Sequence, residues 1–174
     1  MLSLRLLSLD DREAFYKAFN EPWESHFDFI HYWESLADMN FDKYVAMSPG
    51  FSQGLHIPKE HVPAILLFAF NELGEIVGRT SIRYELTEQL LKEGGHIGYG
   101  VCPSHRRKGY ATEILKLSLN WVKSNLPNIN KVLVTCDDGN IGSQKTIESN
   151  NGELENIIEV GKGHRKMRYW ISLL

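Results

Sequence analysis

The stretch best suited to chemistry is VCPSHRRKGYAT, residues 101–112, in which a run of basic side chains is followed at once by a glycine. Arg106, Arg107 and Lys108 repel one another unless something negative lies among them. Gly109 is costly inside a regular element, but it lets a ligand approach the backbone closely. The residue types therefore indicate an anion-binding loop.

The elements around this loop suit the same purpose. The strand HIGYGV, residues 96–101, precedes it, and a helix with one apolar face follows from Ala111 to Asn125. A helix N-terminus exposes unpaired N–H groups and carries about half a positive charge. We therefore predict a pyrophosphate site, with a solvated basic turn that caps the helix as the alternative. Neither a Walker motif nor a three-glycine dinucleotide motif is present.

Composition narrows the class of protein. The chain has 174 residues, of which 43% are hydrophobic and 24% charged, and a net charge of −3. These values are typical of one soluble globular domain, residues 1–174, and argue against a nucleic-acid or membrane-surface binder. Cys102 and Cys136 belong to no ligand pattern, so we expect no metal and a reducing compartment. The opening MLSLRLLSLDDRE has no cleavage site, and VPAILLFAF is too short to span a bilayer, so we expect a cytoplasmic protein.

The hydrophobic pattern predicts alternating strands and helices, which indicates an α+β or mixed α/β fold with a layered sheet flanked by helices. The predicted strands are residues 2–7, 64–70, 76–86, 96–101, 131–136, 154–160 and 165–173. The predicted helices are a first one opened by an Asp10–Glu13 capping box and closed by Pro22, then residues 25–40, 87–95, 111–125 and 140–152. NELGE, residues 71–75, is predicted to be a hairpin turn, and residues 48–60 a loop.

Two motifs resemble one known family. The run R-R-K-G-Y-A, residues 106–111, resembles the acyl-CoA signature Q/R-x-x-G-x-G/A of the GNAT superfamily of N-acetyltransferases, and it follows a similar strand ending in V-x-P. Downstream, KVLVTCDDGNIGSQKTIESNNG resembles the second conserved block of that family. The matching positions there are Asn140, Ser143 and Gly152, and Asn140 also stands where a helix N-cap belongs, a role that is compatible with binding. The two blocks together cover residues 95–152.

The resemblance implies both a fold and a ligand. The fold would be α/β (mixed α+β), with a central, mostly antiparallel sheet splayed between its fourth and fifth strands. Acetyl-CoA would be the co-substrate, with its pyrophosphate on the amides of residues 107–111 and its pantetheine arm between the strands 96–101 and 131–136. The implied binding residues are Val101, Arg106, Arg107, Lys108, Gly109, Tyr110, Ala111, Thr112, Asn140 and Ser143. Gly98 and Gly100 fit either a bulge that opens the splay or a packing requirement.

The implied activity is transfer of an acetyl group to a primary amine of a small molecule or peptide, with the N–H of Val101 stabilising the oxyanion. The family's usual glutamate falls near Gly95, so the adjacent His96 is the candidate general base, ahead of Glu85 and Glu93. The family's tyrosine acid falls on Ile147. An acyl-CoA sensor without catalysis and a phosphate- or nucleotide-binding protein are the alternatives.

Aromatic side chains crowd residues 23–51, where this family builds its acceptor side. We expect most of these rings in the core and one or two on the wall of the acceptor pocket. Asp28, Glu34 and Asp38 would attract a cationic amine, unless they form a solvated helix face. GKGHRK, residues 161–166, is predicted to be a hairpin turn that borders the acceptor cleft in this family. A homodimer is also compatible with the resemblance.

Overall fold

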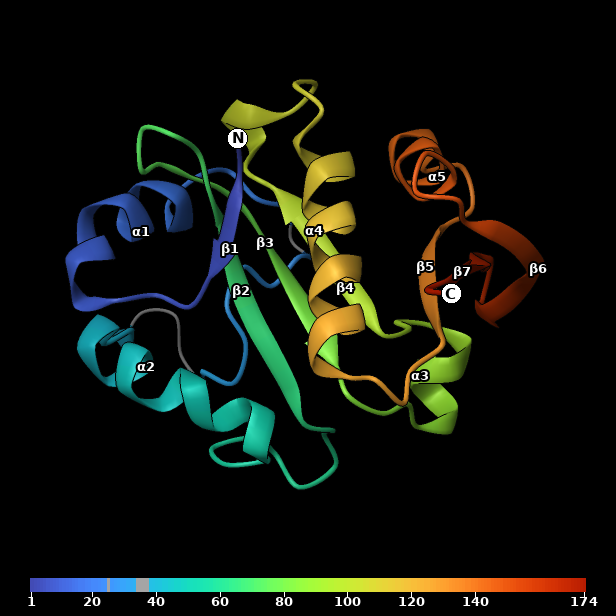
Figure 1. Cartoon of the computed structure of the whole chain (residues 1–174), viewed down its shortest axis with the longest axis horizontal. Coiled ribbons are helices and arrows are strands. Elements are labelled where there is room, and N and C mark those ends of the chain that lie inside the picture. Colours follow the sequence, from blue (N-terminus) through green and yellow to red (C-terminus); the bar gives the residue numbers. More distant parts are fainter. Residues whose placement is uncertain (25, 34–37) are drawn as a thin grey trace.

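The computed structural model describes residues 1–24, 26–33 and 38–174 and contains two antiparallel sheets (Figure 1). The first has the order β1-β2-β3-β4, and its strands are β1 (Ser3–Arg5), β2 (Ala64–Phe70), β3 (Ile76–Arg83) and β4 (Ile97–Val101). The second has the order β5-β7-β6, with β5 (Lys131–Asp137), β6 (Glu153–Gly161) and β7 (His164–Ser172). The α-helices are α1 (Arg12–Phe19), α2 (Phe41–Met47), α3 (Glu88–Lys92), α4 (Tyr110–Asn125) and α5 (Ile141–Glu148).

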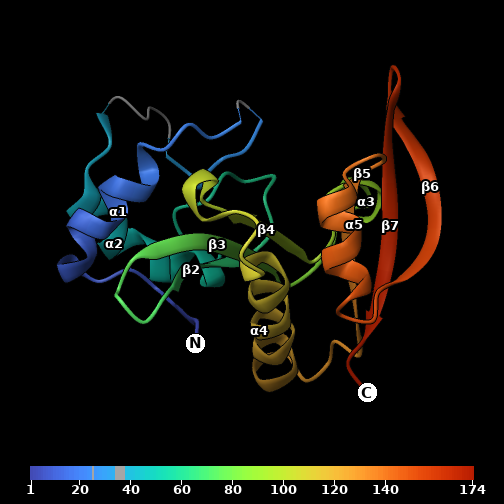
Figure 2. The same ribbon diagram turned by 90° about the horizontal axis from the view of Figure 1, so that it is seen from above.

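Both faces of the first sheet are covered. Along β2, Leu66 and Phe68 belong to an aromatic core that also contains residues of α1 and α2. Leu67 and Ala69, which point to the opposite face, pack with residues of α4. Figure 2 shows α4 on the opposite side of this sheet from α1 and α2. A strand that is buried on both sides must be apolar throughout, which explains the uninterrupted run AILLFAF.

Among the described residues, backbone pairing joins the two sheets at one end only. Gly95, just before β4, forms a bridge with Val134 of β5, and the His96 N–H donates to the Leu133 carbonyl at 2.8 Å. Gly95 has φ +65, and a Cβ there would lie 2.4 Å from the Leu133 oxygen, so this junction requires glycine. Beyond the junction β4 and β5 belong to different sheets (Figure 2). This confirms the predicted splay between the fourth and fifth strands.

The predicted hairpins are confirmed by the antiparallel pairing of β2 with β3 and of β6 with β7. The Asp10–Glu13 capping box is wrong, because the carboxylate that caps this turn belongs to Asp11. It accepts from the N–H and Oγ of Ser8 at 2.7 and 2.9 Å and is held from the other side by Arg5. The arginine anchors Asp11, which delays the start of α1 to Arg12.

The predicted helix over residues 25–40 is wrong for the described residues 26–33, which form turns and bends. The aromatic side chains of this segment repeat at helical spacing, but they do so because each ring packs on a neighbouring element. The backbone of the segment forms hydrogen bonds with other parts of the chain instead of within a helix. Arg79 of β3 donates to the Asp28 carbonyl, and the His31 N–H donates to the Tyr44 hydroxyl at 3.3 Å. Ala37, on which that prediction also rested, and the acidic candidate Glu34 lie outside the described residues.

The following segment is more helical than its sequence pattern suggests. No helix was predicted over residues 41–47, where α2 lies, capped by Asn40, whose Oδ1 accepts from the Lys43 N–H at 3.0 Å. Residues 48–53 of the predicted loop form a 3₁₀ helix. Both helices form because their side chains are buried in the aromatic core: Phe41 and Tyr44 from α2, and Phe51 from the 3₁₀ helix. In such short segments, tertiary packing decides the conformation.

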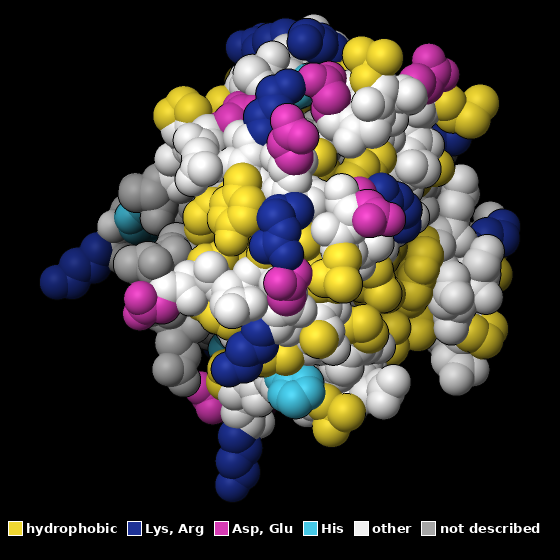
Figure 3. All heavy atoms as spheres, turned by 90° about the vertical axis from the view of Figure 1, so that its left-hand side faces the viewer, with side chains coloured by type: hydrophobic (Ala, Val, Ile, Leu, Met, Phe, Trp, Pro, Cys, Tyr) yellow, Lys and Arg dark blue, Asp and Glu magenta, His cyan; other side chains and the backbone are white. Residues whose placement is uncertain are grey.

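Charged side chains of both signs share the surface beside α1 and α2. Figure 3 shows Lys and Arg next to Asp and Glu on this face, with hydrophobic side chains between them. Lys17 of α1 pairs with Glu75 at 2.7 Å, and Arg12 pairs with Asp42. Across the described ranges, no helix combines the length and apolar character needed to cross a membrane. Within the same ranges, no group of three or more His, Cys, Asp or Glu side chains is arranged to hold a metal ion.

Candidate functional site

A cleft of about 580 Å³, called here the first cleft, opens where β4 and β5 diverge. Nine of the ten predicted cofactor-binding residues line it: Val101, Arg106, Arg107, Gly109, Tyr110, Ala111, Thr112, Asn140 and Ser143. The tenth, Lys108, does not line it, and its Nζ lies 3.5 Å from the Ser104 carbonyl. The fold thus brings both sequence motifs to the same cavity.

The basic loop exposes backbone N–H groups at the start of α4. Arg107 and Gly109 have φ 62 and 81, in the left-handed region, and Gly109 is the residue that precedes the helix. Successive N–H groups in such a turn point to one side and form a concave anion site. The first helical bond runs from the Glu113 N–H to the Gly109 carbonyl, so the preceding N–H groups have no partner within the helix.

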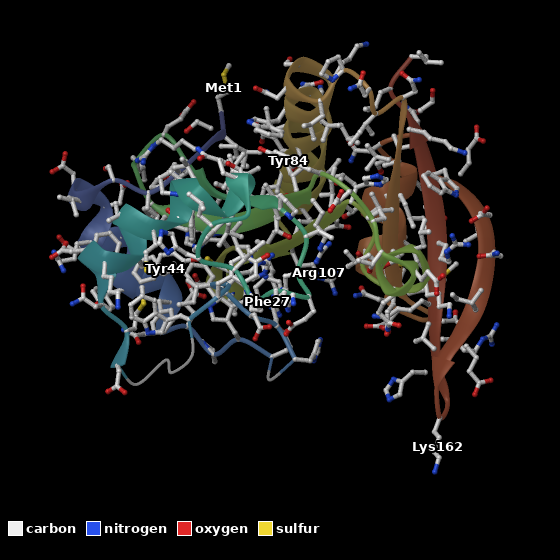
Figure 4. The ribbon with its side chains drawn as sticks, turned by 90° about the horizontal axis from the view of Figure 1, so that it is seen from below. Met1, Phe27, Tyr44, Tyr84, Arg107 and Lys162 are labelled. Atoms are coloured by element: carbon white, nitrogen blue, oxygen red, sulfur yellow. The ribbon has the colours of Figure 1, made fainter. Side chains whose placement is uncertain are left out.

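The three basic side chains of this loop differ in their surroundings. Both terminal nitrogens of Arg106 donate to Glu24, at 2.5 and 2.7 Å, and its Nε donates to the Val101 carbonyl at 3.3 Å. The Arg106 guanidinium lowers the pKa of Glu24 to about 2. Arg107 lines the first cleft together with Phe27, and both are labelled in Figure 4. The charge of Arg106 is therefore largely balanced by Glu24, and Arg107 is the loop's cationic wall.

The backbone of β4 presents unused hydrogen-bonding groups to the first cleft. At the two ends of its pairing with β3, the Cys102 N–H donates to the Val77 carbonyl, and the His96 carbonyl accepts from the Arg83 N–H. Because antiparallel pairs alternate between bonded and non-bonded, the N–H of Val101 must point away from β3. Since β4 is the edge strand of the first sheet, this N–H faces the opening between the sheets.

Neither Gly98 nor Gly100 marks a bulge, and Gly100 is a packing position. The β3–β4 register continues through both of them, so no bulge opens the splay here. A Cβ at Gly100 would lie 2.2 Å from Cζ of Phe27. The Phe27 ring is in turn stacked on Trp23, with centroids 4.7 Å apart. Trp23 and Phe27 both line the first cleft, and Phe27 also lines the second pocket described below.

The opposite wall comes from the start of α5. Asn140 caps this helix by accepting from the Ser143 N–H at 3.1 Å, which confirms the predicted capping role. The Tyr99 hydroxyl lies 2.8 Å from the Ser143 hydroxyl, a contact that links β4 to α5 across the splay. Burial raises the pKa of Tyr99 to about 12. Ile147 is fully buried beneath Gly152, so this position offers nothing to the cleft.

A second pocket of about 410 Å³ adjoins the first cleft. The two cavities share Phe27, Tyr99 and Ser143, along with His26 and Asn140. The second pocket is further lined by these side chains: Asp28, His31, Arg79, Ser81, Arg83, Glu93, Ile97, Thr135, Cys136, Asp137 and Lys166. A ligand in one cavity can therefore meet a ligand in the other beside Tyr99.

Of the acidic candidates, Asp28 and Glu93 line the second pocket, whereas Asp38 and Glu85 line neither cavity. The turn at residues 161–166 reaches the second pocket through Lys166. Figure 4 shows Lys162 at the tip of this hairpin, directed away from the body of the protein.

His96 lies at the closed end of the splay and lines neither cavity. Its Nδ1 accepts from the Leu133 N–H at 3.0 Å. Burial lowers the pKa of His96 to about 4, and the nearby charge of Arg83 adds to the effect. His96 thus contributes to the junction between β4 and β5, where its ring and its backbone both bond to Leu133.

Several lining residues were not predicted from the sequence. Glu24 carries no local signal, because its partner Arg106 is 82 residues away. A local signal does exist for Arg79, Ser81 and Arg83. They stand at alternate positions of β3, whose other side chains apart from Thr80 are apolar, so they share one face of the strand. Two cationic residues on one face of a buried strand are rare enough to mark a site.

Comparisons with known proteins agree with this geometry. The family model described as "Acetyltransferase (GNAT) domain" matches residues 1–152. A curated relative, the uncharacterized N-acetyltransferase YjdG of Bacillus subtilis (strain 168), is 38% identical over 74 residues, 42% of this chain and 42% of that protein. The matched region thus spans less than half the length of this relative.

Two solved structures share the fold. Mutant forms of the spermidine/spermine N-acetyltransferase SpeG from Vibrio cholerae give a TM-score of 0.62 at 15% identity, over 99% of this chain and 95% of that one. The structure of yncA from Salmonella typhimurium, solved with its cofactor acetyl-CoA, gives 0.64 at 14% identity, over 99% and 94%. Because the family model covers most of the sequence, this chain belongs to the acetyltransferase (GNAT) domain family.

Proposed function

We propose that the protein is an N-acetyltransferase that moves the acetyl group of acetyl-CoA to a primary amine. The observation that carries this proposal is the junction of the two cavities. The first cleft ends in an anion-binding helix N-terminus, the second pocket holds charged side chains, and the two meet beside Tyr99. Such a pair of cavities suits a long anionic donor and a separate polar acceptor.

The donor set of the first cleft fits a pyrophosphate. The free N–H groups of Tyr110, Ala111 and Thr112 lie behind a left-handed turn, and Arg107 adds a positive charge. At Gly109 nothing lies within 4 Å of the position of a Cβ, so the backbone is open to an approaching ligand. We propose that these groups bind the diphosphate of acetyl-CoA, with Lys108 and Arg106 adding longer-range attraction.

The edge of β4 is the second element of this proposal. Bound acetyl-CoA supplies the activated acetyl group. The N–H of Val101 is held rigid by the sheet and points into the splay, so it is positioned to donate to the thioester carbonyl oxygen. A preorganised N–H of this kind stabilises negative charge as it develops during acyl transfer.

We further propose that the neutral amine attacks the thioester carbon directly, so that a C–N bond forms and the C–S bond breaks. Tyr99 is then the proton donor to the departing thiolate, and the proton that the nitrogen loses passes through solvent and restores Tyr99. It lines both cavities, its hydroxyl is oriented by Ser143, and its raised pKa keeps it protonated at neutral pH. This assignment compensates for the buried Ile147 at the family's usual tyrosine position. The proposal assigns no proton transfer to His96, because His96 lies outside both cavities.

The sensor alternative is favoured by two departures from the family's pattern: Gly95 offers no carboxylate where the usual glutamate falls, and the buried Ile147 replaces the usual tyrosine. Isothermal titration with acetyl-CoA, coenzyme A and ATP, followed by thiol release with a panel of amines, separates the candidates. An acetyltransferase binds the two coenzymes and releases thiol when an amine is added. Binding without thiol release across the panel supports the sensor, and binding of ATP alone contradicts the assignment of the first cleft.

The role of Tyr99 has a matched control. Tyr99→Phe should lower kcat by about a hundredfold or more, the range typical of lost general acid catalysis, while acetyl-CoA affinity stays within about twofold. Tyr110→Phe removes a hydroxyl from the same cleft and should leave kcat within about twofold. Equal effects of the two substitutions would contradict the assignment.

A further inference from the structure

The second pocket has a cationic inner wall. Arg79, Ser81 and Arg83 stand at alternate positions of β3 and therefore point to the same face of the first sheet. Arg79 is 4% exposed and Ser81 is 1% exposed. Thr80, on the other face, instead accepts from Ser118 of α4 at 3.0 Å. A charged side chain on a sheet face that is otherwise aromatic needs a specific reason.

The fold satisfies only part of the hydrogen-bonding capacity of this wall. Arg79 donates to the Asp28 carbonyl, and its guanidinium lies 4.3 Å from the centre of the Phe27 ring. Its Nε is nevertheless buried without a hydrogen-bond partner, and so is the Ser81 Oγ. Arg83 donates from Nη1 to the carbonyls of Gly94 and Gly95, at 3.2 and 2.9 Å. Buried polar atoms are normally paired, so two orphans on one pocket wall point to an external partner.

The charge of this wall is also not balanced internally. Among residues 1–24, 26–33 and 38–174, no carboxylate forms an ion pair with Arg79 or Arg83. Asp137, which lines the same pocket, pairs with Lys166 at 2.6 Å. Burial lowers the pKa of Arg79 to about 10, which leaves it protonated at neutral pH. A buried cation without a counterion costs free energy, which a bound anion would offset.

The facing strand leaves room for such an anion. Gly98 of β4 pairs with Ser81, and a Cβ at Gly98 would lie 3.4 Å from the Ser81 Oγ and 3.9 Å from both terminal nitrogens of Arg83. The glycine therefore keeps this part of the wall accessible to a ligand. The exposed Asp28 and the partly buried Glu93 line the same pocket. Burial lowers the pKa of Arg79 more than the Asp28 charge raises it, and the two side chains form no ion pair.

We infer that the acceptor carries a carboxylate in addition to its primary amine, and that Arg79, Ser81 and Arg83 bind that carboxylate. This inference rests on the proposed function, which makes the second pocket the acceptor site. A guanidinium and a carboxylate form paired, charge-assisted hydrogen bonds, and the Ser81 hydroxyl adds a donor. The acceptor class is thus amino acids or peptides with a free carboxylate close to the amine, rather than polyamines, whose cations would face the arginines.

The test offers each acceptor as three matched probes: an L-amino acid, its carboxamide, and the amine that lacks the carboxyl group. Methionine, phenylalanine and lysine provide three such sets. We expect acetyl transfer to the free amino acid to exceed transfer to its carboxamide by about thirtyfold or more in kcat/KM in at least one set. Equal use of the three forms in every set that is turned over would overturn the inference.

Variants locate the effect in the wall. Arg83→Gln should lower kcat/KM for the preferred amino acid by about thirtyfold and change that for its carboxamide by less than about twofold. Ser81→Ala, a small change that the fold accommodates, should act in the same direction by about fivefold. Arg12→Gln, at an exposed arginine of α1 that pairs with Asp42 and lines neither cavity, is the matched control and should change neither value.

A binding measurement separates this inference from the proposed function. The thermal stability of the coenzyme A complex is measured with the amino acid, the carboxamide and the amine at equal concentration. Stabilisation by the amino acid alone, lost in Arg83→Gln, supports the carboxylate site even if no acetyl group is transferred. Turnover of amines without any preference for the carboxylate in rate or stabilisation supports the proposed function and overturns the inference.

Discussion

The first cleft and the second pocket are built in different ways. The first is formed mainly by backbone: the left-handed turn at Arg107 and Gly109, the start of α4 and the free edge of β4. The second is formed by side chains, with Arg79 and Arg83 on β3 and contributions from Asp28 and Lys166. A backbone site recognises a phosphate by geometry, whereas a side-chain site depends on the identity of each residue.

This difference predicts how each cavity responds to substitution. The first cleft should tolerate side-chain changes and be sensitive to changes of backbone conformation or local charge. The second pocket should lose or change its ligand when a single side chain is altered. We consider four substitutions in order of decreasing expected effect. Two alter the first cleft, one alters the junction between β4 and β5, and one alters the place where the two cavities meet.

The largest effect is expected at Gly109. Gly109→Asp should weaken acetyl-CoA binding by about a hundredfold or more, because it places a carboxylate beside the diphosphate and strains a residue with φ +81. Gly109→Asn, which tolerates the left-handed region and is neutral, is the control and should lose about tenfold or less. Isothermal titration measures both. Unchanged affinity in Gly109→Asp would contradict the placement of the diphosphate.

The junction between β4 and β5, which joins the two sheets, should make the stability of the protein depend on pH. Because the folded pKa of His96 is about 4 and the unfolded value is 6.5, the unfolded state binds more protons between these values. The free energy of unfolding should therefore fall as the pH drops from 6.5 to 4, by up to about 3 kcal/mol from this residue.

His96→Asn keeps an acceptor for the Leu133 N–H but does not titrate, so it should flatten the pH dependence in this window. Denaturant unfolding at several pH values is the measurement. Part of the slope should remain, because burial also lowers the pKa of His31. A variant as pH-dependent as the parent protein would show that His96 does not couple protonation to the junction.

Gly100 lies where the two cavities meet, and Gly100→Ala should destabilise the protein by about 1–3 kcal/mol, the usual cost of overpacking. The new Cβ would overlap the Phe27 ring, which is held between Trp23 and Arg79 and cannot withdraw freely. Gly98→Ala is the matched control, since its nearest contact would be 3.4 Å, and it should cost less than about 1 kcal/mol. Equal losses of thermal stability would show that Phe27 is not the constraint.

The smallest effect is expected from Glu24. Glu24→Gln removes the partner that holds Arg106 and a negative charge from the rim of the first cleft. Acetyl-CoA binding should tighten by about twofold to fivefold at low salt and return to the parent value at high salt. Glu21→Gln, which removes the negative charge of the carboxylate that accepts from the Ser104 hydroxyl at 2.7 Å, is the control and should have no such effect. Weaker binding by Glu24→Gln would show that the ion pair organises the loop.

Local patterns predicted most of the fold. The strands with strict periodicity, the helix that begins near Ala111 and both hairpins were predicted from spacing and turn residues, and all are present. The segment around residues 26–33 could not be predicted, because its rings repeat at helical spacing for another reason. They fill a core made by α1, β2 and α2, and the backbone bonds to Arg79 and Tyr44.

The candidate site likewise has parts that local sequence predicts and parts that depend on distant residues. Asn140 could be predicted as a helix cap from its neighbours alone, and the basic loop as an anion site from twelve consecutive residues. The balance of charge in that loop could not be predicted from the sequence, because the partner of Arg106 is Glu24, which lies 82 positions away in the chain. The remoteness of His96 from both cavities is likewise a consequence of how β4 meets β5.

The amino-acid sequence alone determined the order of elements, the start of α4 and the run of donors that precedes it, because these depend on residues within a few positions of one another. Tertiary structure decided which charges are balanced, which glycines face a ring, and that Arg79, Ser81 and Arg83 line a pocket beside Tyr99. The physical reason is that burial and counter-charges arise only when distant segments pack together. A cation in a strand is ordinary in a sequence, and it becomes informative once the fold buries it without a counterion.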